Sequence, residues 1–223
     1  MSKQFVVIGL GRLGSVMAKT LDELGHTVLA IDQDETLIQN LTDDLPHVHL
    51  VAADATDEAV LRDLGVQNFD GAAVVIGGNI QAGILATVLL KELGVPHVIS
   101  RASSATHAKV LDKIGADRVI QPEKEMGAQV ARTLASPAVL DYVDLGGDEA
   151  IIETEVPEKW LNHSLAELQL SRKHGLTVLA LKAKGQAGTI PRGDTVLHEG
   201  DVMVVGGSKK NLDRSDLLQS RDR

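Results

Sequence analysis

The sequence contains no cysteine, which excludes disulfide bonds, thiolate zinc sites and cysteine nucleophiles. Aromatic residues are scarce, with one Trp, one Tyr and two Phe among 223 residues. Few rings are therefore available to stack on the bases of a single-stranded nucleic acid. Cations are outnumbered as well, by 31 acidic to 22 basic residues, and the formal net charge is −9 at pH 7. Because contacts to a phosphate backbone need clustered cations, we expect no nucleic-acid partner.

Long apolar runs are missing too. The longest one outside a predicted strand, residues 82–90, is interrupted by Gly83 and falls far short of the ~20 residues of a membrane span. The N-terminus leads straight into a predicted strand, without the apolar segment of a signal peptide. We therefore expect a cytoplasmic protein that acts at a membrane only through a partner.

What the sequence does contain is a regular alternation of two hydrophobic periods over its first 135 residues. Strands are predicted at residues 5–8, 27–31, 48–51, 72–76, 97–100 and 118–120, and helices at 12–25, 35–44, 57–64, 79–94, 104–114 and 123–135. Buried strands between amphipathic helices indicate a parallel sheet covered on both faces. The prediction is an α/β fold, a Rossmann-like doubly wound parallel sheet with strand order 3-2-1-4-5-6.

The rhythm changes after residue 135, and Ser136-Pro137 is the predicted boundary because a residue before proline is pushed out of the helical region. The predicted domains are residues 1–136, which bind nucleotide, and residues 137–223, a small C-terminal α+β domain. Its strands are predicted at 138–145, 151–156, 178–182, 195–197 and 202–205, and its helices at 161–169 and 212–218. A domain this small is marginal alone, so we expect it to dimerise. The tail, residues 209–223, is expected to be frayed at its end.

A glycine-rich loop follows the first predicted strand directly, with the sequence G-L-G-R-L-G at residues 9–14. Gly9 suits a tight turn, Gly11 close approach of the backbone to a pyrophosphate, and Gly14 close packing of helix on strand. The following helix offers free N–H groups and a positive dipole end to phosphate. Asp32 ends the second strand and can accept hydrogen bonds from a ribose diol. The combination predicts a bound adenine nucleotide; glycines that serve only packing are the alternative.

The ends of the other strands are expected to line the same crevice, since ligands of open parallel sheets bind beyond the carboxyl ends of the strands. Asp54-Ala55-Thr56 follows the third strand, where it can meet the adenine. The alternative is that Thr56 or Asp57 is a plain N-cap of the next helix. Gly77 and Gly78 follow the fourth strand and allow close backbone approach, and the next residue, Asn79, starts a helix.

Two charged residues complete the predicted crevice. Arg101 ends the fifth strand, where a cation reaches phosphate. Glu123 starts the sixth helix, where it is either a partner of the helix dipole or a contact to metal or ribose.

The sequence offers no evident catalytic set for hydride transfer, which needs a general acid or base near a nicotinamide. The only tyrosine, Tyr142, has no lysine four residues later, and His163, His174 and His198 are isolated. We expect nucleotide binding with a conformational response rather than an enzyme. An NAD-dependent oxidoreductase and a stand-alone nucleotide sensor are the alternatives.

Several stretches resemble one known family: residues 5–14, 53–56, 76–81, 89–93 and, most specifically, 110–127. Over about residues 4–207 the chain is similar to the cytosolic RCK (KTN) gating subunits of bacterial potassium uptake systems, of the KtrA type with TrkA as a relative. The resemblance implies dimers of RCK units assembled into an octameric ring, docked at the inner face of the membrane beneath a KtrB-like potassium-translocating subunit. It also implies that ATP and ADP compete for the Rossmann site, with NAD(H) as the alternative ligand.

Position by position, the resemblance implies the following nucleotide-binding residues: Gly9, Gly11, Arg12, Gly14, Asp32, Gln33, Asp34, Asp54, Ala55, Ile76, Gly77, Gly78, Arg101, Ala102, Ser103, His107 and Glu123. Arg12 falls where the family has an arginine that reaches a neighbouring subunit's nucleotide. Glu123 falls at the acidic residue where the family holds a divalent cation or Na⁺ between subunits. Arg101 replaces a lysine of the relatives, and Asp34 replaces an asparagine.

The C-terminal domain resembles the family's RCK_C domain, which in several relatives binds cyclic di-AMP at its dimer interface. The resemblance places such a site near residues 165–174, where the expected basic residue is displaced from Ser171 to Arg172. Together these expectations describe a regulatory subunit whose ring changes shape between ATP and ADP and so controls a membrane partner.

Overall fold

The computed structural model describes residues 2–136, 138–183, 186–215 and 217. The chain divides into two compact units, one ending at Glu123 and the other starting at Lys124. The predicted domain boundary after residue 136 stays a prediction, and Pro137 lies outside the described residues. None of the helices in the described part is long and apolar enough to cross a bilayer.

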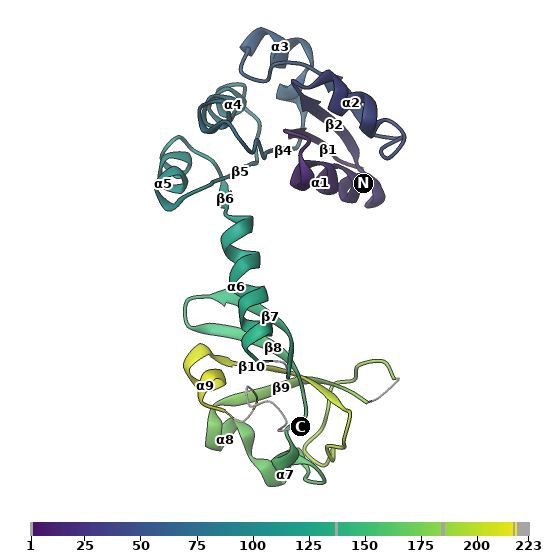
Figure 1. Ribbon diagram of the computed structural model, residues 1–223, viewed down its shortest axis with the longest axis vertical. Helices are drawn as coiled ribbons and strands as arrows, with labels where there is room; N and C mark the ends of the chain where they lie inside the picture. Colours follow the sequence, from purple (N-terminus) through teal and green to yellow (C-terminus); the bar gives the residue numbers. More distant parts are fainter. Residues whose placement is uncertain (1, 137, 184–185, 216, 218–223) are drawn as a thin grey trace. The chain divides into compact units, whose positions relative to one another are not determined.

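The first unit is built on a six-stranded parallel sheet (Figure 1). Its strands are β1 (Gln4–Ile8), β2 (Thr27–Asp32), β3 (His49–Ala52), β4 (Gly71–Val74), β5 (Val98–Arg101) and β6 (Arg118–Ile120). Their order is β3-β2-β1-β4-β5-β6, which confirms the predicted order. The chain therefore winds outward in both directions from β1, which pairs with both β2 and β4. This pairing makes the carboxyl end of β1 the point where the topology reverses.

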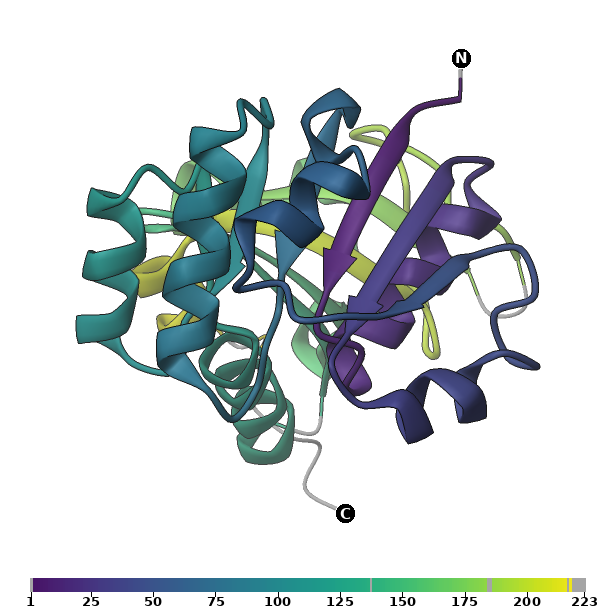
Figure 2. The ribbon, with the colours of Figure 1, turned by 90° about the horizontal axis from the view of Figure 1, so that it is seen from above.

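Helices cover both faces of this sheet. They are α1 (Arg12–Glu23), α2 (Glu35–Leu41), α3 (Glu58–Asp63), α4 (Ile80–Glu92) and α5 (Ala105–Lys113), with a 3₁₀ turn η1 (Val66–Asn68). Successive residues of β1 enter opposite cores: Val6 packs with Leu61 and Leu90, and Val7 with Ala18. Helices α4 and α5 lie side by side (Figure 2). Burial on both faces is the reason that these strands consist of almost continuous apolar runs.

The second unit contains a four-stranded antiparallel sheet in the order β7-β8-β10-β9. The strands are β7 (Val139–Gly146), β8 (Glu149–Glu155), β9 (Leu176–Lys182) and β10 (Val202–Ser208). Helix α6 (Pro122–Ala135) starts in the first unit and continues into the second. The other helices of the second unit are α7 (Leu165–Leu168), α8 (Leu170–His174) and α9 (Lys209–Arg214), with a 3₁₀ turn η2 (Glu158–Trp160). Its own apolar core contains Ile152, Leu176, Leu197, Met203 and Trp160. The predicted small α+β domain is confirmed.

Three elements predicted in this unit differ from the structure. Residues 195–197 are not a strand, because Thr195 and Leu197 hydrogen-bond to the segment around His163 and Leu165 instead of to the sheet. The predicted helix 161–169 is only α7, and α8 follows it separately because Gln169 adopts a left-handed conformation with φ +50°. The predicted helix 212–218 is displaced to α9, and the end of the tail lies outside the described residues.

Candidate functional site

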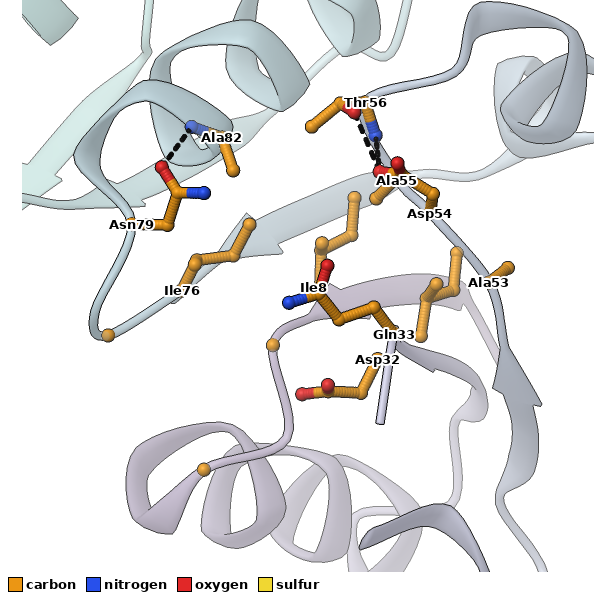
Figure 3. Close-up of a pocket in the computed structure, with 14 residues that line it drawn as sticks. Ile8, Asp32, Gln33, Ala53, Asp54, Ala55, Thr56, Ile76, Asn79 and Ala82 are labelled. Carbon is orange, nitrogen blue, oxygen red and sulfur yellow. Dashed lines mark hydrogen bonds between the residues drawn. The ribbon is translucent and has the colours of Figure 1, made fainter. Parts of the chain in front are cut away.

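A pocket opens at the carboxyl end of the parallel sheet, where the topology reverses between β1 and β4 (Figure 3). Residues that follow β1, β2, β3 and β4 all contribute to its wall, so residues far apart in sequence meet there. The pocket is lined by Ile8, Gly9, Gly11, Ile31, Asp32, Gln33, Ala53, Asp54, Ala55, Thr56, Ile76, Gly77, Asn79 and Ala82. Open parallel sheets bind their ligands at this position.

Two glycines of the G-L-G-R-L-G segment after β1, Gly9 in the loop and Gly14 in α1, are required by packing. Gly9 has φ +93°, and a Cβ added there would lie 2.9 Å from the backbone nitrogen of Ile76. A Cβ on Gly14 would lie 1.8 Å from the carbonyl oxygen of Gly9. Helix α1 therefore packs directly against the loop, and only glycine fits at either position. Packing is the role that the sequence predicts for Gly14.

The third glycine, Gly11, borders open space. A Cβ added to Gly11 would meet nothing within 4 Å. Gly11 is the N-cap of α1, yet no side chain caps this helix and its first turn contains no acidic residue. The N–H groups at a helix N-terminus, with its positive dipole end, suit an anion such as phosphate. The uncapped start of α1 beside the pocket is therefore suited to a phosphate group.

Asp32 is held in a fixed orientation by two backbone groups. Its Oδ2 accepts a hydrogen bond from the backbone N–H of Leu10 at 2.7 Å, and its Oδ1 accepts one from the N–H of Asp34 at 3.0 Å. The first bond ties the end of β2 to the glycine loop. Each carboxylate oxygen keeps a second acceptor site, so Asp32 is positioned to bind a ribose diol and to repel a 2′-phosphate.

The wall after β3 is shaped by a tight turn. Oδ1 of Asp54 accepts hydrogen bonds from the backbone N–H and the hydroxyl of Thr56, at 2.9 and 2.7 Å. These bonds lower the pKa of Asp54, which keeps it ionised. Asp57 caps α3 by accepting from the N–H of Ala59, so the helix-cap interpretation is confirmed for Asp57. Asn79 caps α4 in the same way.

Arg101 stands behind the pocket wall. Its guanidinium donates hydrogen bonds to the carbonyl oxygens of Ile76 and Gly77, at 3.3 and 3.4 Å. Its other terminal nitrogen forms an ion pair with Glu123. Hydrogen bonding to Arg101 lowers the pKa of Glu123 and keeps that carboxylate charged.

Two family models match this chain, the TrkA-N domain over residues 5–122 and the TrkA-C domain over residues 150–217. The Ktr system potassium uptake protein A of Bacillus subtilis is 42% identical over 213 residues, covering 96% of this chain and 95% of that protein. The chain is a member of the TrkA/Ktr family. The Ktr system potassium uptake protein C of the same species is 39% identical, and the Ktr protein A of Vibrio alginolyticus is 35% identical over 94% of both chains.

Solved structures agree on the fold of this family member. The crystal structure of the GsuK RCK domain superposes with a TM-score of 0.70 at 18% identity, covering 100% of this chain and 49% of that chain. The GsuK channel bound to NAD gives a TM-score of 0.70 at 17% identity, covering 99% of this chain and 40% of that chain. This TrkA/Ktr chain thus spans half or less of the length of those proteins and shares their fold. The resemblance to RCK subunits is confirmed.

The pocket at the carboxyl end of the parallel sheet contains only part of the predicted site. Of the predicted residues, those that line it are Gly9, Gly11, Asp32, Gln33, Asp54, Ala55, Ile76 and Gly77. Those that do not are Arg12, Gly14, Asp34, Gly78, Arg101, Ala102, Ser103, His107 and Glu123. Asp34 instead caps α2, where its Oδ1 accepts hydrogen bonds from the N–H groups of Thr36 and Leu37.

Six lining residues are not among the nucleotide-binding residues that the resemblance implies: Ile8, Ile31, Ala53, Thr56, Asn79 and Ala82. Thr56 and Asn79 follow strands whose ends the sequence analysis expects at the crevice. Three of the six sit at or next to the end of a strand, so the general rule for parallel sheets is the signal that could have found them. Ala82 also lines the pocket, and its N–H donates to Oδ1 of the cap residue Asn79 (Figure 3).

A metal site is not assembled by the described part of this chain. It contains no group of three or more His, Asp or Glu side chains that could hold an ion. Glu123, the predicted metal ligand, is paired with the cation of Arg101. In the described residues Glu123 is engaged with Arg101, and an ion held between subunits at Glu123 stays a prediction.

His107 is buried behind the end of β5, with 7% of its surface exposed. The backbone N–H of Ser103 donates to its Nδ1 at 3.3 Å, so a neutral ring carries its proton on Nε2, which has no hydrogen-bond partner. Burial and the nearby charge of Arg101 lower the pKa of His107 from its ordinary value of 6.5. The fold therefore favours the neutral imidazole.

This histidine predicts a pH dependence of stability. Because the folded pKa lies below the unfolded one, the unfolded chain binds more protons in that window, and stability is lost as the pH falls through about 6.5. We expect the unfolding free energy between pH 7.5 and 5.5 to fall less steeply in His107→Gln than in the wild type. His47→Gln, which removes an exposed histidine, serves as the matched control. Equal slopes in all three proteins, measured by urea unfolding, would contradict the interpretation.

Proposed function

We propose that this chain is the cytosolic regulatory subunit of a potassium uptake system and that it responds to an adenine nucleotide in the pocket of its first unit. The uncapped N-terminus of α1 beside Gly11, close to the braced carboxylate of Asp32, is the observation that carries the proposal. Relatives with up to 42% identity are named Ktr system potassium uptake proteins. The GsuK structures bound to NAD and to ADP support a nucleotide as the ligand.

Two parts of the pocket, Asp32 and the start of α1, then have defined tasks. When bound, ATP or ADP supplies a ribose diol and the negative charge of its phosphates. Asp32 accepts hydrogen bonds from the ribose hydroxyls, and the first N–H groups of α1 bind phosphate oxygens. Arg12 is exposed and lies outside the pocket of its own chain. From the family resemblance we assign it to the nucleotide of a neighbouring subunit.

The regulatory step follows from these contacts. A third phosphate adds charge that Arg12 of a neighbouring copy can bind, whereas ADP lacks it. A ligand with different contacts in two assemblies shifts the equilibrium between them. We infer a homo-oligomeric ring, an octamer built from dimers, whose shape differs between ATP and ADP. The ring lies at the inner face of the membrane, and a KtrB-like subunit embedded in the membrane reads its shape.

The test combines binding, assembly and transport. Mass spectrometry of the purified protein identifies a co-purifying ligand, and titration gives dissociation constants for ATP, ADP and NADH. Native mass spectrometry with ATP or ADP gives the assembly, and potassium uptake is measured in cells that carry the membrane subunit. We expect both nucleotides to bind and to differ in ring geometry and transport rate. Indistinguishable rings and rates with the two nucleotides would refute the regulatory role.

The oxidoreductase remains the rival because Asp32 suits the ribose of NAD(H) as well as that of ATP. Substrate-dependent reduction of bound NAD would support it. Binding of a nucleotide without turnover, together with co-purification of an integral membrane protein, supports the regulator over both the enzyme and a stand-alone sensor.

A second ligand belongs to the second unit in this proposal. A hollow there is lined by Lys159, Trp160, His163, Glu167, Leu168, Leu170, Lys173 and His174, and it overlaps the predicted cyclic di-AMP neighbourhood at residues 165–174. Glu167 is engaged by Ser164 in a capping box and keeps its charge, and two lysines, Lys159 and Lys173, line the same hollow. Titration with cyclic di-AMP tests this part, and no saturable binding would dismiss it.

A further inference from the structure

Arg101 is the side chain that connects the pocket wall with the start of α6. Its Nη1 donates to the carbonyl oxygens of two residues of the wall, Ile76 and Gly77. A Cβ on Gly77 would lie 3.7 Å from Nη1, so no side chain separates the guanidinium from the loop. The Arg101 side chain is 16% exposed. The guanidinium is thus held in a largely dry position directly behind the wall.

The partner of Arg101 is held much less firmly. Glu123 is the second residue of α6, and its side chain is 65% exposed. A carboxylate that is mostly in water loses little when it leaves an ion pair. The largely buried guanidinium, in contrast, needs an anion beside it. The guanidinium therefore needs an anion as its partner, but this anion need not be Glu123.

The pocket itself supplies no competing cation. Its described lining contains the carboxylates of Asp32 and Asp54 but no Lys, Arg or His. Phosphate oxygens suit a guanidinium as well as a carboxylate does, with the same planar, charge-assisted geometry. A phosphate group in the pocket would therefore compete with Glu123 for Arg101.

We propose that Arg101 and Glu123 form a latch that a phosphate group opens: Arg101 turns to the phosphate, and the Glu123 carboxylate is left without its cation. The inference rests on the proposed nucleotide function and adds a route by which occupancy of the pocket is sensed. Glu123 belongs to the helix through which the chain passes from the first unit to the second. By linkage, anything that strengthens the pair weakens phosphate binding to the same extent.

The test is calorimetric titration of the full-length protein with adenosine, ADP and ATP. In Glu123→Gln the competitor is removed, so ADP and ATP should bind about two- to fivefold more tightly, the strength of one exposed ion pair. Adenosine should bind as it does to the wild type, which also reports that the variant is folded. Arg101→Gln should bind ADP and ATP more weakly and leave adenosine unchanged.

A matched control removes a carboxylate from a different ion pair. Glu153→Gln breaks the pair with Lys182 in the second unit and should leave all three dissociation constants unchanged. If Glu123→Gln binds ADP as the wild type does, or more weakly, the latch is refuted. If ADP and ATP fail to bind the wild type, the proposed function itself fails, which separates the two results.

Discussion

Replacing Gly14 with alanine is expected to lower the unfolding free energy of the first unit by about 2–4 kcal/mol, at the upper end of the cost of overpacking. The added methyl carbon would lie 1.8 Å from the carbonyl oxygen of Gly9, and the obstacle is backbone rather than a flexible side chain. Helix α1 must then move away from the loop, and the pocket loses its shape. Differential scanning calorimetry should show an earlier transition for the first unit.

The single tryptophan provides an internal reference for this variant. Trp160 is buried in the core of the second unit, so its fluorescence reports on that core alone. We expect the Trp160 transition of Gly14→Ala to match the wild type. A shift in the Trp160 transition equal to the calorimetric one would show that the substitution acts on the whole chain rather than on the α1 contact.

Gly11→Ser is the matched control in the same G-L-G-R-L-G segment. The position borders open space and has φ −59°, which serine adopts without strain. Serine is a preferred N-cap residue, so stability should be kept or slightly raised. Its hydroxyl would bind the N–H groups of α1 that we assign to phosphate, so ADP should bind more weakly. Equal affinity of Gly11→Ser and the wild type for ADP would contradict a phosphate at this helix end.

Much of the first unit could be predicted because its signals are local. Each strand is an apolar run with a helix after it, and the rule for such alternation defines the sheet order. The same rule places Gly9, Gly11 and Asp32 at one edge of the sheet, where the structure has them. A strand that is buried on both faces leaves little freedom to pair elsewhere.

The structure adds most to the sequence where contacts between distant segments decide. Residues 195–197 have the composition of a strand, but their hydrogen bonds go to residues 162–165. The pairing of Arg101 with Glu123 joins residues 22 apart in sequence and depends on how β5 and α6 are placed. Asp34 was assigned to the ligand by resemblance, yet the aspartate directly precedes α2 and its side chain caps that helix. Aspartate is a preferred residue directly before a helix, so the sequence itself favours the N-cap role for Asp34.

Asp32→Asn is expected to weaken binding of both adenosine and ADP about 10- to 100-fold, the range for a lost hydrogen bond to a charged group. The equal loss for the two ligands follows because Asp32 is assigned to the ribose, which both contain. The amide also places an N–H donor against the backbone N–H of Leu10 or of Asp34, both of which now donate to the carboxylate. The glycine loop then loses one of its tethers to β2.

Asp34→Asn separates this role from that of its neighbour. Asparagine caps helices as well as aspartate does, so α2 and the stability of the chain should be unchanged. Because the Asp34 side chain is engaged with Thr36 and Leu37 rather than the pocket, the affinity for adenosine and ADP should also stay at the wild-type value. Isothermal titration calorimetry of both variants measures their affinities for adenosine and ADP. A comparable loss of affinity in Asp34→Asn would mean that this carboxylate contacts the ligand, and the ribose would then be held by two acidic residues instead of Asp32 alone.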